Sequence, residues 1–195
     1  MNICFSPIPV NLNVDNIDGL ELAINVGSNC FYTSTESSLT WVPDKLYQPG
    51  RNWGYINDEA DEANKEVSVQ TDIKQTPDGS LFQRLRSNPA GYRLDVPPGE
   101  YELELLFADV FNPKENLMYQ LGQANTGRSI GNTFDILING QVVNQAYAPA
   151  QESGQFSAAR KRYIVRPTEG AIDIRFHIVK GKSFLNGLKL RKLTN

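Results

Sequence analysis

Histidine and cysteine are scarce in this sequence of 195 residues, which contains one histidine and two cysteines. A metal site built from several imidazoles is therefore excluded, and a Ser-His-Asp triad would have to use His177. That histidine lies on the polar side of an alternating stretch, so an ordinary surface residue is the simpler interpretation. Two cysteines are too few for a disulfide framework. We expect Cys4 and Cys30 to be buried or free thiols, although they could pair if the N-terminal segment folds back.

The usual motifs of catalytic and nucleotide-binding sites are also missing. No G-x-S-x-G turn is present to expose a nucleophilic serine, and no glycine-rich loop opens a helix to bind phosphate. A pair of carboxylates for glycoside hydrolysis stays open, because any two of the 22 acidic residues could converge. No sequence pattern supports that possibility, and we expect the chain not to be an enzyme.

Long hydrophobic runs and an excess of positive charge are absent as well. No apolar run approaches the ~20 residues that span a bilayer. Residues 1–14 lack the positively charged region and cleavage site of a signal peptide. The net charge of −3 offers no basic surface for phosphates. We therefore expect neither nucleic acid nor a membrane as a partner, and the chain is either cytoplasmic or a piece of a longer exported protein.

Alternation of apolar and polar residues is the main pattern that the sequence does contain. A period of two is typical of strands that bury one face. It occurs in the stretches 93–96, 101–107, 134–138 and 172–178. Further strand-like runs occur at 22–26, 67–71, 162–165 and 188–193. No helical periodicity persists long enough to predict a substantial helix.

Turn-forming residues separate these strands. Asn139-Gly140 is a strong hairpin turn, and Pro97-Pro98-Gly99 predicts a second antiparallel reversal. Residues 27–66 and 111–132 lack a strand pattern and are expected to be long irregular loops, which tend to carry function. The predicted fold class is all-β, an antiparallel β-sandwich or jelly roll that forms one domain.

Aromatic residues are concentrated in one stretch. Trp41, Tyr47, Trp53 and Tyr55 lie within fifteen residues, among turn-forming Pro, Gly, Asp and Asn. One interpretation is a hydrophobic cluster that closes one end of the sandwich. The other is a sugar site, because an aromatic ring receives the apolar face of a pyranose while amide, carboxylate and guanidinium groups bind its hydroxyls.

Six blocks of sequence, in order, resemble the malectin-like carbohydrate-binding domain over about residues 21–193. They are INVGSN at 24–29, LTWVPDKLYQPGRNWGY at 39–55, SLFQRLRS at 80–87, YRLDVPPGEYELELLFADVF at 92–111, FDILINGQVV at 134–143 and IDIRFHIVKGKSFLNGLKLRKL at 172–193. The likeness is greatest to the version near the C-terminus of family-two glycoside hydrolases, β-galactosidases of gut Bacteroidetes. This resemblance implies a galactose-binding-like jelly roll that binds glycan and catalyses nothing itself.

The resemblance also implies where a glycan would bind. An aromatic residue in the family's Asp-Tyr-Gly turn corresponds to Trp53, and a Tyr-Phe pair corresponds to Phe111 and Asn112. Ser87 stands where the family's site has a further tyrosine, and the family's final aspartate has no counterpart near 181–183. The sugar that the family's site binds is therefore not expected to bind here in the same way. We predict Trp53, Tyr55 and Phe111 as stacking platforms and Arg51, Asn52, Gln83 and Asn112 as hydroxyl partners.

Two hypotheses follow for residues 21–195, which would form the carbohydrate-binding domain behind an N-terminal arm at 1–20. The first is a glycan-binding module attached to the catalytic domain of a larger polypeptide. The second is a structural accessory domain that packs on the catalytic domain and binds no sugar. Both imply a periplasmic or extracellular location as part of an exported protein. No cofactor is expected, and a structural Ca²⁺ ion stays open.

Overall fold

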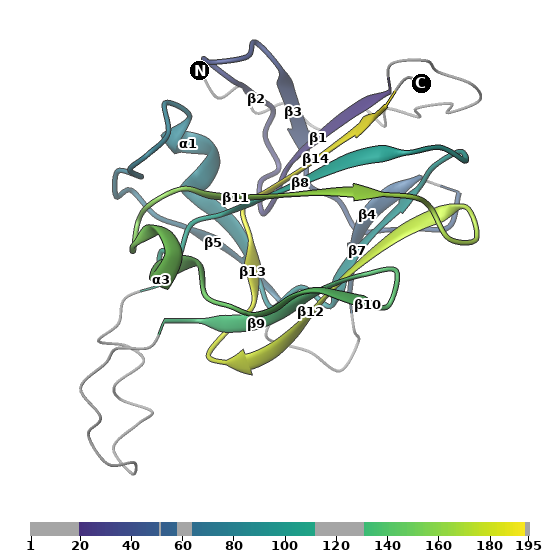
Figure 1. The fold of residues 1–195 in the computed structure, drawn as a ribbon. Helices are drawn as coiled ribbons and strands as arrows, with labels where there is room; N and C mark the ends of the chain where they lie inside the picture. Colours follow the sequence, from purple (N-terminus) through teal and green to yellow (C-terminus); the bar gives the residue numbers. More distant parts are fainter. Residues whose placement is uncertain (1–19, 51, 58–63, 112–130, 194–195) are drawn as a thin grey trace.

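The computed structural model describes residues 20–50, 52–57, 64–111 and 131–193, and their strands form three β-sheets (Figure 1). The six-stranded sheet has the order β11 (Ala159–Val165), β8 (Tyr101–Phe107), β14 (Gly187–Lys192), β1 (Glu21–Asn25), β3 (Thr40–Pro43), β2 (Tyr32–Thr33). The five-stranded sheet has the order β10 (Gln141–Tyr147), β9 (Thr133–Ile138), β12 (Ala171–Lys180), β7 (Gly91–Asp95), β4 (Trp53–Ile56). The three-stranded sheet consists of β13 (Phe184–Leu185), β6 (Arg84–Ser87) and β5 (Lys65–Ser68).

Helix is a minor component of the described residues. It is confined to α1 (Gly79–Phe82) and α3 (Pro149–Ser153), of four and five residues. Neither is long and apolar enough to cross a membrane. Among the described strands all named pairs are antiparallel except β1 with β3. The predicted all-β, antiparallel sandwich is therefore confirmed.

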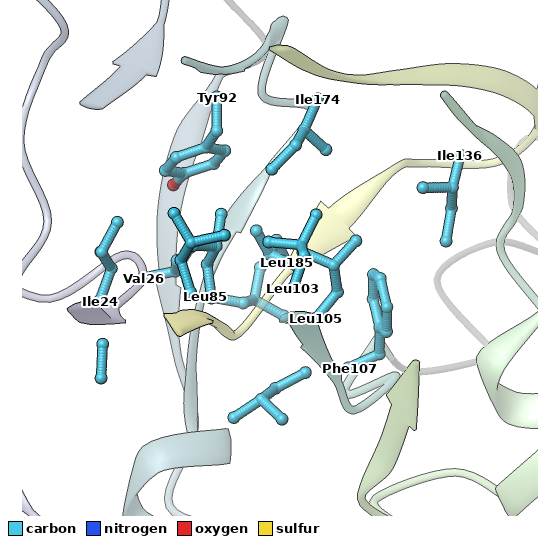
Figure 2. Packing of buried hydrophobic residues seen from close by; sticks show 14 of the residues in the cluster. Ile24, Val26, Leu85, Tyr92, Leu103, Leu105, Phe107, Ile136, Ile174 and Leu185 are labelled. Carbon is cyan, nitrogen blue, oxygen red and sulfur yellow. The ribbon is translucent and has the colours of Figure 1, made fainter. Parts of the chain in front are cut away.

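The core lies where the two larger sheets face each other (Figure 2). Leu103, Leu105 and Phe107 of β8 are fully buried, as the period-two pattern predicts. They pack with side chains from the other sheet, among them Ile136 of β9 and Ile174 of β12. Burial of these apolar side chains supplies the main favourable term for folding.

The two predicted turns differ in what they connect. Asn139 and Gly140 both have positive φ, 51° and 77°, and join β9 to β10 as a hairpin, which confirms the first prediction. Pro97-Pro98-Gly99 joins β7 to β8, and these strands belong to different sheets, so the predicted antiparallel pairing is wrong. The same turn chemistry serves a crossover from one layer to the other, which turn composition alone does not distinguish.

Two further expectations are corrected by the structure. Residues 27–66 were expected to be irregular, yet they contain β2, β3 and β4. The expectation of free thiols is contradicted at Cys30, which is disulfide-bonded and buried. Cys4 lies outside the described residues, as does most of the predicted 111–132 loop.

Asn186 is a buried side chain that links three separate segments of the chain. It is 0% exposed and lies in the Leu-Asn-Gly-Leu block between β13 and β14. Its Oδ1 accepts a hydrogen bond from the Ala108 N–H, and its Nδ2 donates to the carbonyls of Phe82 and Arg84. One amide thereby pairs the backbone groups of Ala108 just after β8, Phe82 in α1 and Arg84 in β6, which are buried or partly buried.

We expect Asn186→Ala to lower the free energy of unfolding by about 3 kcal/mol or more, because several buried backbone groups lose their partners. Gln145→Ala is the matched control, since this amide is exposed on β10 and its loss should change stability by about 0.5 kcal/mol or less. Chemical denaturation of the three proteins measures the difference. Equal denaturation midpoints for Asn186→Ala and the wild type would contradict this role of Asn186.

Candidate functional site

The aromatic residues of the 41–55 stretch lie in different surroundings in the structure. Trp53 was predicted on a loop, but it lies on β4, is 6% exposed and belongs to the core, so that placement is wrong. Its ring is further covered by Lys45, whose Nζ is 4.2 Å from the ring centroid. Trp41 on β3 is also buried. Both tryptophans thus follow the interpretation of a hydrophobic cluster.

Gly54 explains why this strand resembles a turn in the sequence. The segment 45–47 runs along β4, with the Tyr47 N–H bonded to the Tyr55 carbonyl and the Tyr55 N–H bonded to the Lys45 carbonyl. A Cβ at position 54 would lie 2.4 Å from the Tyr47 nitrogen. Glycine is therefore required by a close backbone approach inside a strand.

A buried ion pair supports Tyr55. The Nε of Arg86 on β6 lies 2.8 Å from Oδ2 of Asp44, and only 6% and 1% of the two side chains are exposed. The same oxygen accepts hydrogen bonds from the Gly27 N–H and the Tyr92 hydroxyl. Burial alone would lower the pKa of Arg86, but the Asp44 carboxylate outweighs it and raises that pKa. Burial also raises the pKa of Asp44, and Arg86 together with these hydrogen bonds opposes the rise.

The remaining donors of Arg86 fix the strand next to it. Nη1 donates to the Asn64 side chain at 3.2 Å, and Nη2 lies 3.1 Å from Oε1 of Glu66 on β5. The guanidinium stacks on the ring of Tyr55, with its central carbon 3.6 Å from the ring centroid. One face of this predicted platform is therefore occupied by Arg86.

Phe111 provides an aromatic ring at another margin of the three-stranded sheet. It is half-buried and packs on Phe184 of β13 with ring centroids 5.6 Å apart. The Nζ of the exposed Lys182 lies 4.7 Å from the Phe111 ring centroid. The backbone carbonyl of Phe111 accepts a hydrogen bond from the Gln155 side chain. A partly exposed ring is thus held from several sides.

Buried polar side chains fix the turns around this ring. Asp109, 1% exposed, accepts hydrogen bonds from the Phe111 N–H and from the Asn132 amide. Burial raises the pKa of Asp109, and these hydrogen bonds oppose the rise. The Oδ1 of Asn132 in turn accepts from the Lys182 N–H at 2.9 Å. The turns at 109–111, 131–133 and 181–183 are therefore tied together.

Asn88 completes the surface around Phe111. Its Oδ1 accepts from the Ser183 N–H, and its own N–H donates to the Ser183 carbonyl. We call the half-buried Asn88 and Phe111, together with the exposed Lys182, the Phe111 patch, and the buried Asn132 and Ser183 hold it from below. The patch joins one aromatic ring to an amide and an ammonium group, the two kinds of group that a pyranose requires.

The predicted site residues do not form one cluster. Tyr55 contacts Arg86 of β6, and Phe111 contacts Phe184 of β13, two strands that pair with each other. Asn52 and Trp53 lie at the opposite end of β4, beside Asp95 and Leu94.

The other three predicted site residues are Gln83, Arg51 and Asn112. Gln83 bonds to the Thr71 carbonyl through its side chain, just before β6. Arg51 and Asn112 lie outside the described residues. Asn88, Asn132 and Lys182 were not predicted, because only the tertiary contacts of three separate turns bring them to Phe111. The mapping of the family's aspartate to 181–183 was the one sequence clue to that surface.

Metal binding was left open by the sequence. In the part of the chain that the structure describes, no group of three or more His, Cys, Asp or Glu side chains is placed to hold a metal ion.

Comparison with known proteins gives one family and two groups of structures. The model of the malectin domain matches residues 20–189. The chain is similar to a β-glucuronidase of Bacteroides uniformis, with 47% identity and a TM-score of 0.75 over 90% of this chain and 18% of that one. The chain thus spans less than a fifth of that enzyme. No curated protein sequence matches.

Plant receptor-like kinases share the fold at low identity. FER is 18% identical with a TM-score of 0.64, over 89% of this chain and 49% of that one. The extracellular domain of ANXUR2 from Arabidopsis thaliana is 16% identical with a TM-score of 0.65, over 89% and 49%. The predicted likeness to a Bacteroides glycoside hydrolase is confirmed, with a β-glucuronidase as the similar enzyme rather than a β-galactosidase.

We expect Arg86→Ala to destabilise the protein by about 3–5 kcal/mol, because Asp44 is then left buried and unpaired. Arg84→Ala on the same strand is the control, with an expected loss below about 1 kcal/mol because Arg84 is less buried. Thermal and urea unfolding measure both. A loss for Arg86→Ala no larger than that for Arg84→Ala would show that the ion pair does not support this region.

Proposed function

This chain belongs to the malectin domain family, and we propose that it is a non-catalytic glycan-binding module of a larger glycoside hydrolase. The family is a carbohydrate-binding type, which supports a glycan as the ligand. The similar β-glucuronidase is more than five times as long as the matched region, which supports a catalytic domain in the same polypeptide as a partner. The extracellular domain of ANXUR2 has the same fold, and we propose a periplasmic or extracellular location for this chain.

The Phe111 patch is the observation that carries the proposed binding. Its ring is partly exposed, in contrast to the buried Trp53, and is fixed by Phe184 beneath it. A sugar ring stacked on Phe111 would lie within reach of the Lys182 ammonium and the Asn88 amide. Because Asn88 is already held to Ser183 by hydrogen bonds, ordering its side chain costs little on binding. We propose Phe111 as the stacking platform, with Asn88 and Lys182 as hydroxyl partners.

Tyr55 keeps a smaller part in this proposal. Arg86 covers one face of its ring, so sugar stacking would have to use the other face or the ring edge. Asn112 follows Phe111 directly and stays in the proposal as a hydroxyl partner. No cofactor is proposed.

A second function, a structural domain that docks on the catalytic domain, is favoured by one separate observation. Four branched aliphatic side chains are exposed on β10 and β12: Val142, Val143, Ile178 and Val179, with exposures of 54%, 39%, 50% and 58%. Exposed apolar surface of this kind is typical of contact with another domain. None of these four side chains belongs to the Phe111 patch.

The isolated chain is expected not to hydrolyse glycosides, since none of its motifs supports acid–base catalysis. Release of nitrophenol from nitrophenyl β-galactoside and β-glucuronide measures this directly. Turnover at about 1 s⁻¹ or more, the lower range for enzymes, would contradict the proposal.

Glycan binding is tested by array screening of the wild type, followed by calorimetric titration with the best ligand. We expect Phe111→Ala to weaken binding by about 1–3 kcal/mol, through loss of an apolar stacking surface. Phe111→Leu should weaken it nearly as much while it preserves the apolar contact with Phe184.

Ile164→Ala is the surface control, because this side chain is 59% exposed on β11 and should leave affinity unchanged. Melting temperatures of all variants separate loss of binding from loss of fold. Unaltered affinity in both Phe111 variants would place the site elsewhere. No binding to any glycan by a folded wild type would leave docking as the function.

A further inference from the structure

A pocket on the six-stranded sheet shares no residue with the Phe111 patch. It has a volume of about 120 Å³ and is lined by residues of β3, β8, β11 and β14, together with the β2–β3 hairpin and α1. In Figure 1, α1 lies beside this sheet, and the β2–β3 hairpin forms one of its edges. Five separate stretches of sequence, 34–41, 78–81, 104–106, 160–162 and residue 189, therefore line one small pocket.

The buried lining of the pocket is half apolar and half polar, and the apolar half includes an indole, while Ser34, Asp78 and Glu104 are its buried polar members. Trp41, Leu81 and Leu106 are the apolar members and are 5%, 1% and 1% exposed. The Nε1–H of Trp41 has no hydrogen-bond partner among the described residues. Unpaired buried donors are uncommon in proteins, because each one loses its hydrogen bond to water on folding.

The lining carries charges of both signs in equal number. The acidic members are Glu36, Asp78 and Glu104, and the basic members are Arg160, Arg162 and Lys189. Arg162 Nε lies 2.8 Å from Oε1 of Glu104, and Arg160 Nη2 lies 3.8 Å from Oε2 of Glu36. Lys189 Nζ lies 2.7 Å from Oε1 of Glu21, outside the lining. Asp78 accepts hydrogen bonds from Tyr32, Ser34 and the Thr35 N–H. The acidic and basic residues of the lining are therefore equal in number, and each already has a partner.

We propose that this pocket is a second carbohydrate site, which takes a single neutral sugar unit. A neutral polyol both donates and accepts hydrogen bonds, so it can bind between the paired charges without breaking a pair. The apolar members receive its C–H groups. The volume is several times the roughly 10–15 Å³ needed by one water and below the ~300 Å³ of pockets that hold drug-sized ligands, which limits the occupant to one small unit.

The proposal shares with the proposed function only the class of ligand. It needs no contribution from Phe111, and the Phe111 patch needs none from Trp41. Two separate sites on one module would let it hold two units of a branched glycan or of neighbouring chains, which increases overall avidity.

The two tryptophans make the test direct. The chain has two indole N–H groups, of Trp41 and Trp53, so its ¹H–¹⁵N spectrum has two indole resonances, which Trp53→Phe assigns. We expect methyl β-galactoside or methyl α-glucoside, titrated to tens of millimolar, to shift the Trp41 resonance with saturation. The Trp53 resonance should stay in place.

Variants separate this site from the Phe111 patch. Ser37→Tyr places a large side chain at the pocket and should reduce affinity at least tenfold, whereas Ser68→Tyr, at an exposed position on β5, should not. Phe111→Ala should leave the Trp41 shift intact. Overturning results are a Trp41 resonance that does not move with either methyl glycoside, a shift that survives Ser37→Tyr, a shift lost with Phe111→Ala, or tighter binding of methyl β-glucuronide than of both neutral probes.

Discussion

The buried pair of Asp44 and Arg86 is the interaction on which this side of the molecule depends. Through one guanidinium it links the segment after β3 to β6, and through Asn64 and Glu66 it links β6 to β5. The Asp44 carboxylate also binds the Tyr92 hydroxyl, which attaches the group to the five-stranded sheet. A charge this deeply buried is stable only when it is paired and hydrogen-bonded, so these segments have one compatible arrangement.

The proposed glycan site is positioned by the same small sheet. β6 carries Arg86 beneath Tyr55 and pairs with β13, where Phe184 supports Phe111. Asn186 directly follows β13 and binds the carbonyls on either side of Gln83. The ring that is proposed to receive a sugar is therefore attached to the core through Phe184, while the hydrogen-bonded turns around it present the polar groups.

The strands that contain a sustained alternation could be predicted from the sequence, and β2, β3 and β4 could not. The alternating stretches within β8, β9 and β12 are 101–107, 134–138 and 172–178, long enough to establish a period of two. β2 and β4 have two and four residues, and Gly54 within β4 reads as a turn former although it serves a close backbone contact. That misassignment placed Trp53 on a loop. The resemblance identified Phe111, but Asn88, Asn132 and Lys182 approach it only through tertiary contacts.

A crystal structure of the chain with its best array glycan tests the central claim most directly, because it locates the sugar without relying on a variant. The account predicts a pyranose ring stacked on Phe111, with hydroxyls bonded to Asn88 and Lys182. A bound glycan that leaves the Phe111 ring uncovered would contradict it.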